Sequence, residues 1–76
     1  MNMLEANAPF ADGIKKIIKK KGMRNWYVAQ KAGYSAENFS RMLNGKKLIK
    51  ACDIPCIAEA LGVEITEIYK VGKEDR

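Results

Sequence analysis

Apolar residues recur at the spacing of an α-helix along most of this chain, and no segment alternates apolar and polar residues as a strand does. The apolar positions of the first amphipathic stretch are Phe10, Ile14, Ile17 and Ile18. Pro9 suits a first helical turn, where its missing N–H would be unbonded in any case. Gly22 follows a lysine cluster that favours a helix end. We therefore predict a first helix from about Pro9 to Gly22 and a flexible N-terminus over residues 1–7.

Two shorter amphipathic segments follow, and they flank a turn at Gly33-Tyr34-Ser35. The apolar residues on one face of each segment are Val28, Ala29 and Ala32 in the first, and Phe39, Met42 and Leu43 in the second. Gly33 can supply the positive φ that a sharp turn between helices needs, and Ser35 can cap the second helix. Helices over 25–32 and 35–43 with this turn are typical of a helix-turn-helix, whose second helix enters the DNA major groove.

The rest of the chain predicts two more helices after a basic loop over residues 46–52. Asn44-Gly45 is a strong turn signal, and Asp53 suits an N-cap. The residues expected to point inward in the fourth helix are Ile54, Ile57, Ala58 and Leu61. Val63, Ile65, Ile68 and Tyr69 suggest a short fifth helix that closes the core. We therefore expect an all-α protein, a compact bundle of five helices. A single domain would span residues 8–71, followed by a polar tail over 72–76.

The length and the residue types limit the chemistry that this chain can perform. A domain of 76 residues is too small for a large buried active site. The chain has two cysteines, Cys52 and Cys56, and no histidine, so a four-ligand zinc site would need carboxylate ligands. We expect reduced thiols, one or both of them in the core. With no evident base to activate a thiol and no Gly-rich phosphate loop, we expect no enzyme, metal, cofactor or small-molecule ligand.

The N-terminal sequence and the hydropathy favour a cytoplasmic protein. The first residues show no basic start followed by an apolar stretch, so we do not expect a signal peptide. No apolar run approaches the roughly 20 residues that a membrane span needs. We therefore expect no membrane partner.

The net charge of +5 is unevenly distributed along the chain. Between Lys15 and Lys50, eleven basic residues stand against one acid, Glu37, which gives this span a net charge of +10. A face that binds a polyanion would produce such segregation. A role in solubility alone would explain the lysines of the first helix. It would not explain why acids are nearly absent from the same span.

Two sequence blocks carry a family resemblance. The segment VAQKAGYSAENFSRMLNGK, which starts at Val28, resembles the Cro and phage-repressor (XRE-type) family of helix-turn-helix regulators. A second block, IAEALGV, from Ile57 to Val63 resembles the fourth helix of that family and the turn into its fifth. The resemblance extends from about Ile14 to Tyr69. It implies a bundle of the lambda-repressor-like DNA-binding type, with the helix-turn-helix formed by helices 2 and 3.

The resemblance also implies which residues read the bases. The base-reading positions of the third helix hold Ala36, Glu37 and Arg41, and Ser40 is adjacent to them on the outward face. Arg41 can donate two hydrogen bonds to guanine O6 and N7, and Glu37 can accept one from cytosine N4. The Ala36 methyl group can touch a thymine methyl group. Alternatively, Arg41 is a surface residue that pairs with Glu37, four residues earlier on the same face. Both can hold, because Glu37 could orient Arg41.

Residues around the third helix are expected to contact the DNA backbone, which fixes the register without reading the sequence. These residues are Arg24, Asn25, Trp26, Asn38, Asn44, Lys46, Lys47 and Lys50. Asn38 could instead bond an adenine. Trp26 and Tyr27 stand where the family usually has small or polar residues. They could pack over the first helix, lie on the sugar-phosphate backbone, or cover a protein contact.

These observations favour a sequence-specific DNA-binding transcriptional regulator, a repressor of phage or prophage type, whose partner is double-stranded DNA. A palindromic site would require a homodimer, for which the expected surface is Ile65, Ile68, Tyr69 and Val71. The alternative is a protein-interaction module on the same scaffold, such as an antitoxin-like or anti-repressor subunit. Trp26, Tyr27 and Glu37 are the features that support this alternative.

Overall fold

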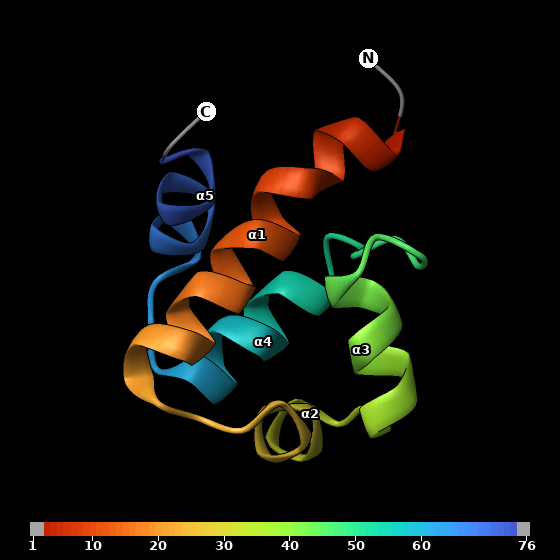
Figure 1. Ribbon diagram of the computed structural model, residues 1–76, viewed down its shortest axis with the longest axis vertical. Coiled ribbons are helices and arrows are strands. Elements are labelled where there is room, and N and C mark those ends of the chain that lie inside the picture. The colour runs from red at the N-terminus through yellow and green to blue at the C-terminus, as the bar shows by residue number, and fades with distance from the viewer. Residues whose placement is uncertain (1–2, 75–76) are drawn as a thin grey trace.

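Five α-helices make up the computed structural model, which describes residues 3–74 of the chain (Figure 1). Their bounds are Met3–Lys21 (α1), Asn25–Ala32 (α2), Ala36–Leu43 (α3), Asp53–Leu61 (α4) and Ile65–Lys73 (α5). No strand occurs between residues 3 and 74, so the predicted all-α class is confirmed. None of the helices in this part of the chain is long and apolar enough to cross a membrane.

One hydrophobic core joins all five helices. Its most deeply buried large side chains are Ile14, Val28, Phe39, Met42, Ile57 and Ile68. These are the inward positions that the helical periodicity predicted. In Figure 1, α3 stands at one edge of the molecule and α5 at the opposite edge, with α1 and α4 between them. The outward face of α3 is therefore remote from α5.

Two glycines bring α1 and α5 into very close contact. A Cβ atom added to Gly13 would overlap the carbonyl of Ile68. One added to Gly72 would overlap the carbonyl of Pro9 and lie 2.9 Å from the amide nitrogen of Gly13. Only hydrogen atoms fit between the two backbones at these positions. Gly72 is buried for this reason, and α5 extends to Lys73, beyond the expected start of the polar tail at residue 72. Residues 75 and 76 of that tail lie outside the described residues.

The N-terminal helix is longer than the periodicity predicted. It begins at Met3, six residues before Pro9, so residues 3–7 are part of the helix in this structure. Residues 1 and 2 lie outside the described part of the chain. Pro9 has no N–H to donate to the preceding turn, but Asn7 hydrogen-bonds to Ile49 and ties this end of α1 to the loop before α4. The sequence pattern held no signal of this contact, because the two residues are 42 positions apart.

The start of α4 corrects two smaller expectations. Cys52, and not Asp53, is the residue that precedes the helix, and Asp53 is its first residue. Both Cys52 and Cys56 are free thiols exposed at the surface, so the prediction that at least one lies in the core was wrong. Ile57, Ala58, Ala60 and Leu61 form the buried face of α4, and the cysteines fall outside that face.

Candidate nucleic-acid interface

The turn between α2 and α3 has the geometry that its sequence predicted. Gly33 adopts the left-handed conformation with φ of 92°, and the Tyr34 N–H donates to the carbonyl of Ala29 at 2.8 Å. The Ser35 hydroxyl accepts a hydrogen bond from the N–H of Asn38 at 3.1 Å, which caps α3. These contacts use backbone groups that helix ends leave unpaired. They fix the angle at which α3 leaves α2.

The outward face of α3 carries all four residues that were expected to read bases. Ala36, Glu37, Ser40 and Arg41 are exposed, because Phe39, Met42 and Leu43 occupy the opposite, buried face. No ion pair joins the Glu37 carboxylate to the Arg41 guanidinium among the described residues. The surface ion pair that was the alternative for Arg41 is therefore not formed in this structure. Arg41 is accessible to a ligand that approaches α3.

The loop between α3 and α4 spans residues 44–52 and contains the basic stretch expected over 46–52. We call the whole loop the basic loop, and it folds back onto the end of α3. The N–H groups of Lys46 and Lys47 both donate to the carbonyl of Arg41, at 2.9 and 3.2 Å. The Asn44 amide donates to the Ser40 hydroxyl at 3.3 Å. Lys46, Lys47 and Arg41 are therefore linked through one carbonyl at the C-terminal end of α3. Their positive side chains are exposed there.

The far end of the basic loop is tied to the turn between α2 and α3 through Asp53. Its carboxylate accepts hydrogen bonds from the Tyr34 hydroxyl at 2.5 Å and from the Lys50 N–H at 2.8 Å. Burial tends to raise the pKa of the Asp53 carboxyl. The two hydrogen bonds and the charges of Lys50 and Lys47 outweigh burial, so the pKa lies below its usual value. Burial, and then the bond to Asp53, raise the pKa of the Tyr34 hydroxyl. Sequence reasoning missed this pair, since neither partner belongs to the helical pattern.

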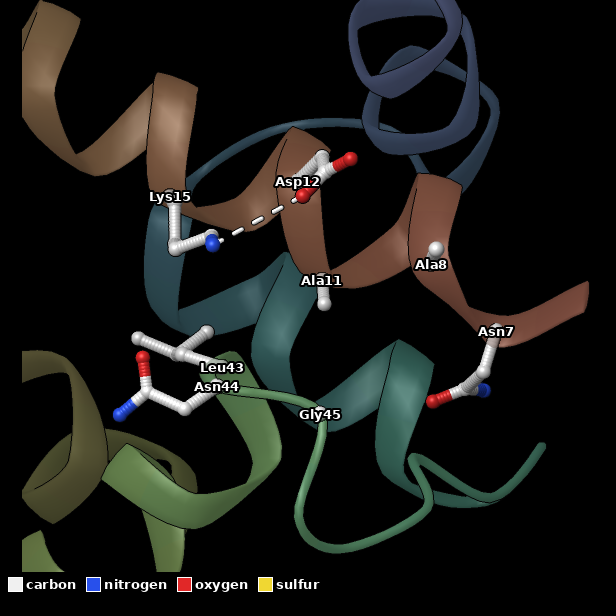
Figure 2. A pocket seen from close by; sticks show the side chains of 8 residues that line it. All are labelled: Asn7, Ala8, Ala11, Asp12, Lys15, Leu43, Asn44 and Gly45. Atoms are coloured by element: carbon white, nitrogen blue, oxygen red, sulfur yellow. Dashed lines mark ion pairs between the residues drawn. The ribbon is translucent and has the colours of Figure 1, made fainter. Parts of the chain in front are cut away.

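A narrow cleft separates α1 from the C-terminal end of α3 (Figure 2). Its lining residues are Asn7, Ala8, Ala11, Asp12, Lys15, Leu43, Asn44 and Gly45. The volume of about 230 Å³ is smaller than that of most small-molecule sites. Lys15, paired with Asp12 at 3.7 Å, lies along this cleft with Asn44. The cleft thus brings a lysine of α1 close to the end of α3, a placement that the sequence analysis did not assign.

The residues that were expected to contact the DNA backbone all lie at the surface. They are Arg24, Asn25, Trp26, Asn38, Asn44, Lys46, Lys47 and Lys50. Arg24 is the N-cap of α2, and its carbonyl accepts from the N–H groups of Tyr27 and Val28. Asn25 and Trp26 form the first turn of α2, where backbone N–H groups point along the axis out of the helix and suit a phosphate.

The aromatic pair on α2 does not cover the core. Trp26 is 58% exposed and Tyr27 is 44% exposed, so neither ring is buried. Their rings meet edge to face with centroids 6.1 Å apart, and the Lys31 ammonium lies 5.5 Å from the Tyr27 ring centroid. These aromatic rings remain open to DNA or to a protein partner.

The basic residues between Lys15 and Lys50 do not form a single face of the folded protein. Lys16, Lys20 and Lys21 line a groove between α1 and α5, together with Glu67, Lys70, Val71, Glu74 and Ile17. The Lys16 ammonium donates to the carbonyls of Val71 and Glu74 at 3.4 and 2.9 Å. This part of the charge lies beside Glu67 of α5 and Glu74 just after it, and α5 is remote from α3 (Figure 1). The basic side chains near α3 are those of Arg41, the basic loop and Lys15 at the cleft.

Comparison with known proteins agrees with this geometry. A family model described as the Cro/C1-type HTH DNA-binding domain matches residues 13–74 of the chain. The match covers α2, the turn, α3 and the two helices that follow. No curated protein matches the chain.

Proposed function

Because the chain belongs to the family of Cro/C1-type helix-turn-helix DNA-binding domains, we propose that it acts as a sequence-specific transcriptional regulator, a repressor of phage or prophage type. One observation carries this proposal: α3 presents Ala36, Glu37, Ser40 and Arg41 on its open face, and a basic loop is fixed at its end. A helix of this kind fits the major groove of B-DNA.

Base readout would depend mainly on Arg41. Its guanidinium can donate two hydrogen bonds to guanine O6 and N7, a pairing worth about 1–3 kcal/mol of discrimination. Glu37 lies one turn earlier on the same face and can accept a hydrogen bond from cytosine N4. Its negative charge disfavours nearby phosphates, so it contributes selectivity more than affinity. Ala36 offers only a methyl group, which suits a thymine methyl group.

Phosphate contacts would come from residues on both sides of α3. On one side are Arg24, Asn25 and Trp26, at the beginning of α2. On the other side are Asn44 and the lysines Lys46, Lys47 and Lys50 of the basic loop. Asn38, in the first turn of α3, can reach either a phosphate or a base. Contacts of this type position the protein and make its affinity depend on salt.

We propose that the protein binds a palindromic site as a homodimer, with half-sites about 34 Å apart or a multiple of that distance. Ile65 and Tyr69 of α5 are exposed and suit the dimer surface. Ile68 does not, because its side chain is fully buried in the core, which corrects the surface expected from the sequence. Val71 is half-buried.

A second candidate function is a protein-interaction module, such as an antitoxin-like or anti-repressor subunit. The exposure of Trp26 and Tyr27 favours it, since a large aromatic side chain left open to solvent is typical of contact surfaces. Under this function the protein would form a stoichiometric complex with a protein partner in the absence of nucleic acid, and Arg41→Ala would leave that complex unchanged.

Selection of bound fragments from random duplex DNA tests the proposed function, since it reports the site, its symmetry and the half-site spacing together. Arg41→Ala should then lower the preference for one guanine by about 1–3 kcal/mol. Lys70→Ala is a matched control, because it removes the same charge from α5 at the opposite edge of the molecule. Weak and equal affinity of the wild-type protein for every sequence, measured by gel shift over a series of salt concentrations, would refute the proposal.

A further inference from the structure

The side chain of Asn7 connects α1 to the middle of the basic loop through two hydrogen bonds. Its amide nitrogen Nδ2 donates to the carbonyl of Ile49 at 2.9 Å. Its oxygen Oδ1 accepts from the N–H of the same residue at 3.0 Å. A carboxamide offers one donor side and one acceptor side, which match the carbonyl and N–H of a single extended residue. Alanine would make neither bond, and aspartate would keep only the acceptor.

Ile49 is the point at which the basic loop is attached to the body of the protein. Its side chain is 4% exposed and belongs to the core, whereas Lys47 and Lys50 on either side of it are exposed. The loop is also held at its two ends, by the Arg41 carbonyl and by the Asp53 carboxylate. Asn7 adds a third attachment between these two, and Figure 2 shows it projecting from α1 beside the cleft that α1 forms with the end of α3.

We propose that Asn7 is a positioning residue for phosphate binding. By fixing the backbone of Ile49, it would hold Lys46, Lys47 and Lys50 in the arrangement in which they meet the DNA backbone. This proposal rests on the DNA-binding function proposed above. Asn7 itself lies on α1, outside the helix-turn-helix, and need not touch the DNA.

The physical reason is conformational entropy. Fixing the backbone of a flexible residue costs conformational entropy, which opposes binding. A loop that is ordered before the DNA arrives therefore loses less entropy on binding than one that becomes ordered on contact. Without Asn7, the buried N–H and carbonyl of Ile49 would lose their partners. The loop would move outward to reach water, and its lysines would lose their fixed positions. Arg41, held in α3, would keep its place in the groove.

Asn7→Ala tests the proposal, with Gln30→Ala as the matched control. Alanine is a better helix former than asparagine, so the substitution does not weaken α1 through propensity. Gln30 carries an exposed amide on α2 and makes no side-chain hydrogen bond among the described residues. For both variants we would measure the affinity for the selected duplex and for a random duplex over a series of salt concentrations, well below the unfolding temperature. Hydrogen exchange at the Ile49 amide would report the state of the loop.

We expect Asn7→Ala to speed exchange at Ile49 and to weaken binding to both duplexes by a similar factor, roughly tenfold for two lost hydrogen bonds. The dependence of affinity on salt should become shallower, because fewer lysines would meet phosphates. The preference for the selected site should stay constant. A purely stabilising role would lower the unfolding temperature and leave the salt dependence unchanged.

Faster exchange at Ile49 with unchanged affinity and salt dependence would overturn this proposal alone. Wild-type protein that binds no duplex would overturn the proposed function, and this proposal with it. If Asn7→Ala does not fold, Asn7→Asp keeps the bond from the Ile49 N–H but sets a carboxylate oxygen against the Ile49 carbonyl, and it should show the same changes. Its control is then Thr66→Asp, which adds the same charge on the exposed surface of α5, and equal effects of these two variants would also contradict the proposal.

Discussion

Two effects give opposite predictions for the stability of Gly13→Ala, in the contact between α1 and α5. Helix propensity predicts a more stable protein, and packing predicts a less stable one. In an exposed helix, alanine in place of glycine stabilises by about 1 kcal/mol. In this structure the new Cβ would overlap the carbonyl of Ile68, which belongs to the backbone of α5 and cannot rotate away. Inserting a carbon into a packed core costs about 1–3 kcal/mol, and sometimes more. Because the overlap involves backbone and not the end of a flexible side chain, we expect the packing cost to exceed the gain in propensity.

The expected result is a net loss of about 2 kcal/mol in the free energy of unfolding, the upper end of the packing cost less the gain in propensity. This loss lowers the midpoint of thermal unfolding by roughly 8–16 °C in a domain of this size. Urea and thermal unfolding followed by far-ultraviolet circular dichroism measure both quantities. Thr66→Ala, on the exposed surface of α5, is the control and should change stability by less than about 0.5 kcal/mol. A Gly13→Ala protein as stable as the wild type, or more stable, would show that α5 does not pack against α1 at this distance.

Two further predictions concern the basic loop. Lys47→Ala should weaken binding to all duplexes alike and lower the slope of log affinity against log salt by about one unit; a change confined to one DNA sequence would contradict this role. The Asp53 carboxyl has a folded-state pKa below its usual value of 3.8, so its charge stabilises the fold above that pH and the contribution is lost as the pH falls through the folded-state pKa. Tyr34→Phe removes a bond that lowers this pKa, so its thermal stability should decline less on acidification than that of the wild type; parallel curves would refute this.

The helix-turn-helix could be predicted from the sequence because its signals are local. Gly33 and Ser35 lie within four residues of the groups that they satisfy, and the apolar positions of α3 leave only one face outward. The exposure of Arg41 follows from that periodicity. Whether Glu37 would pair with it could not be predicted, because four-residue spacing permits the pair without requiring it.

The remaining features depend on residues that are distant in the sequence. The helical state of residues 3–7 accompanies the bonds between Asn7 and Ile49, and the burial of Gly72 depends on α1. The distribution of charge along the sequence also did not predict which basic residues share a surface. Lys16 and Arg41 belong to the same basic span of the sequence, yet α1 directs the first toward α5 and the second lies on α3. Sequence proximity therefore overstated the size of the cationic surface near α3.

The exposure of Trp26 has a practical consequence for spectroscopy. It is the single indole of the chain, and it sits in water at the beginning of α2. Its emission will therefore report little of the core when the protein melts, but it will respond directly to any molecule that comes to rest on that end of α2. A blue shift on mixing with a short duplex would place nucleic acid over the indole, and the same shift with a protein ligand alone would assign that surface to a different class of partner.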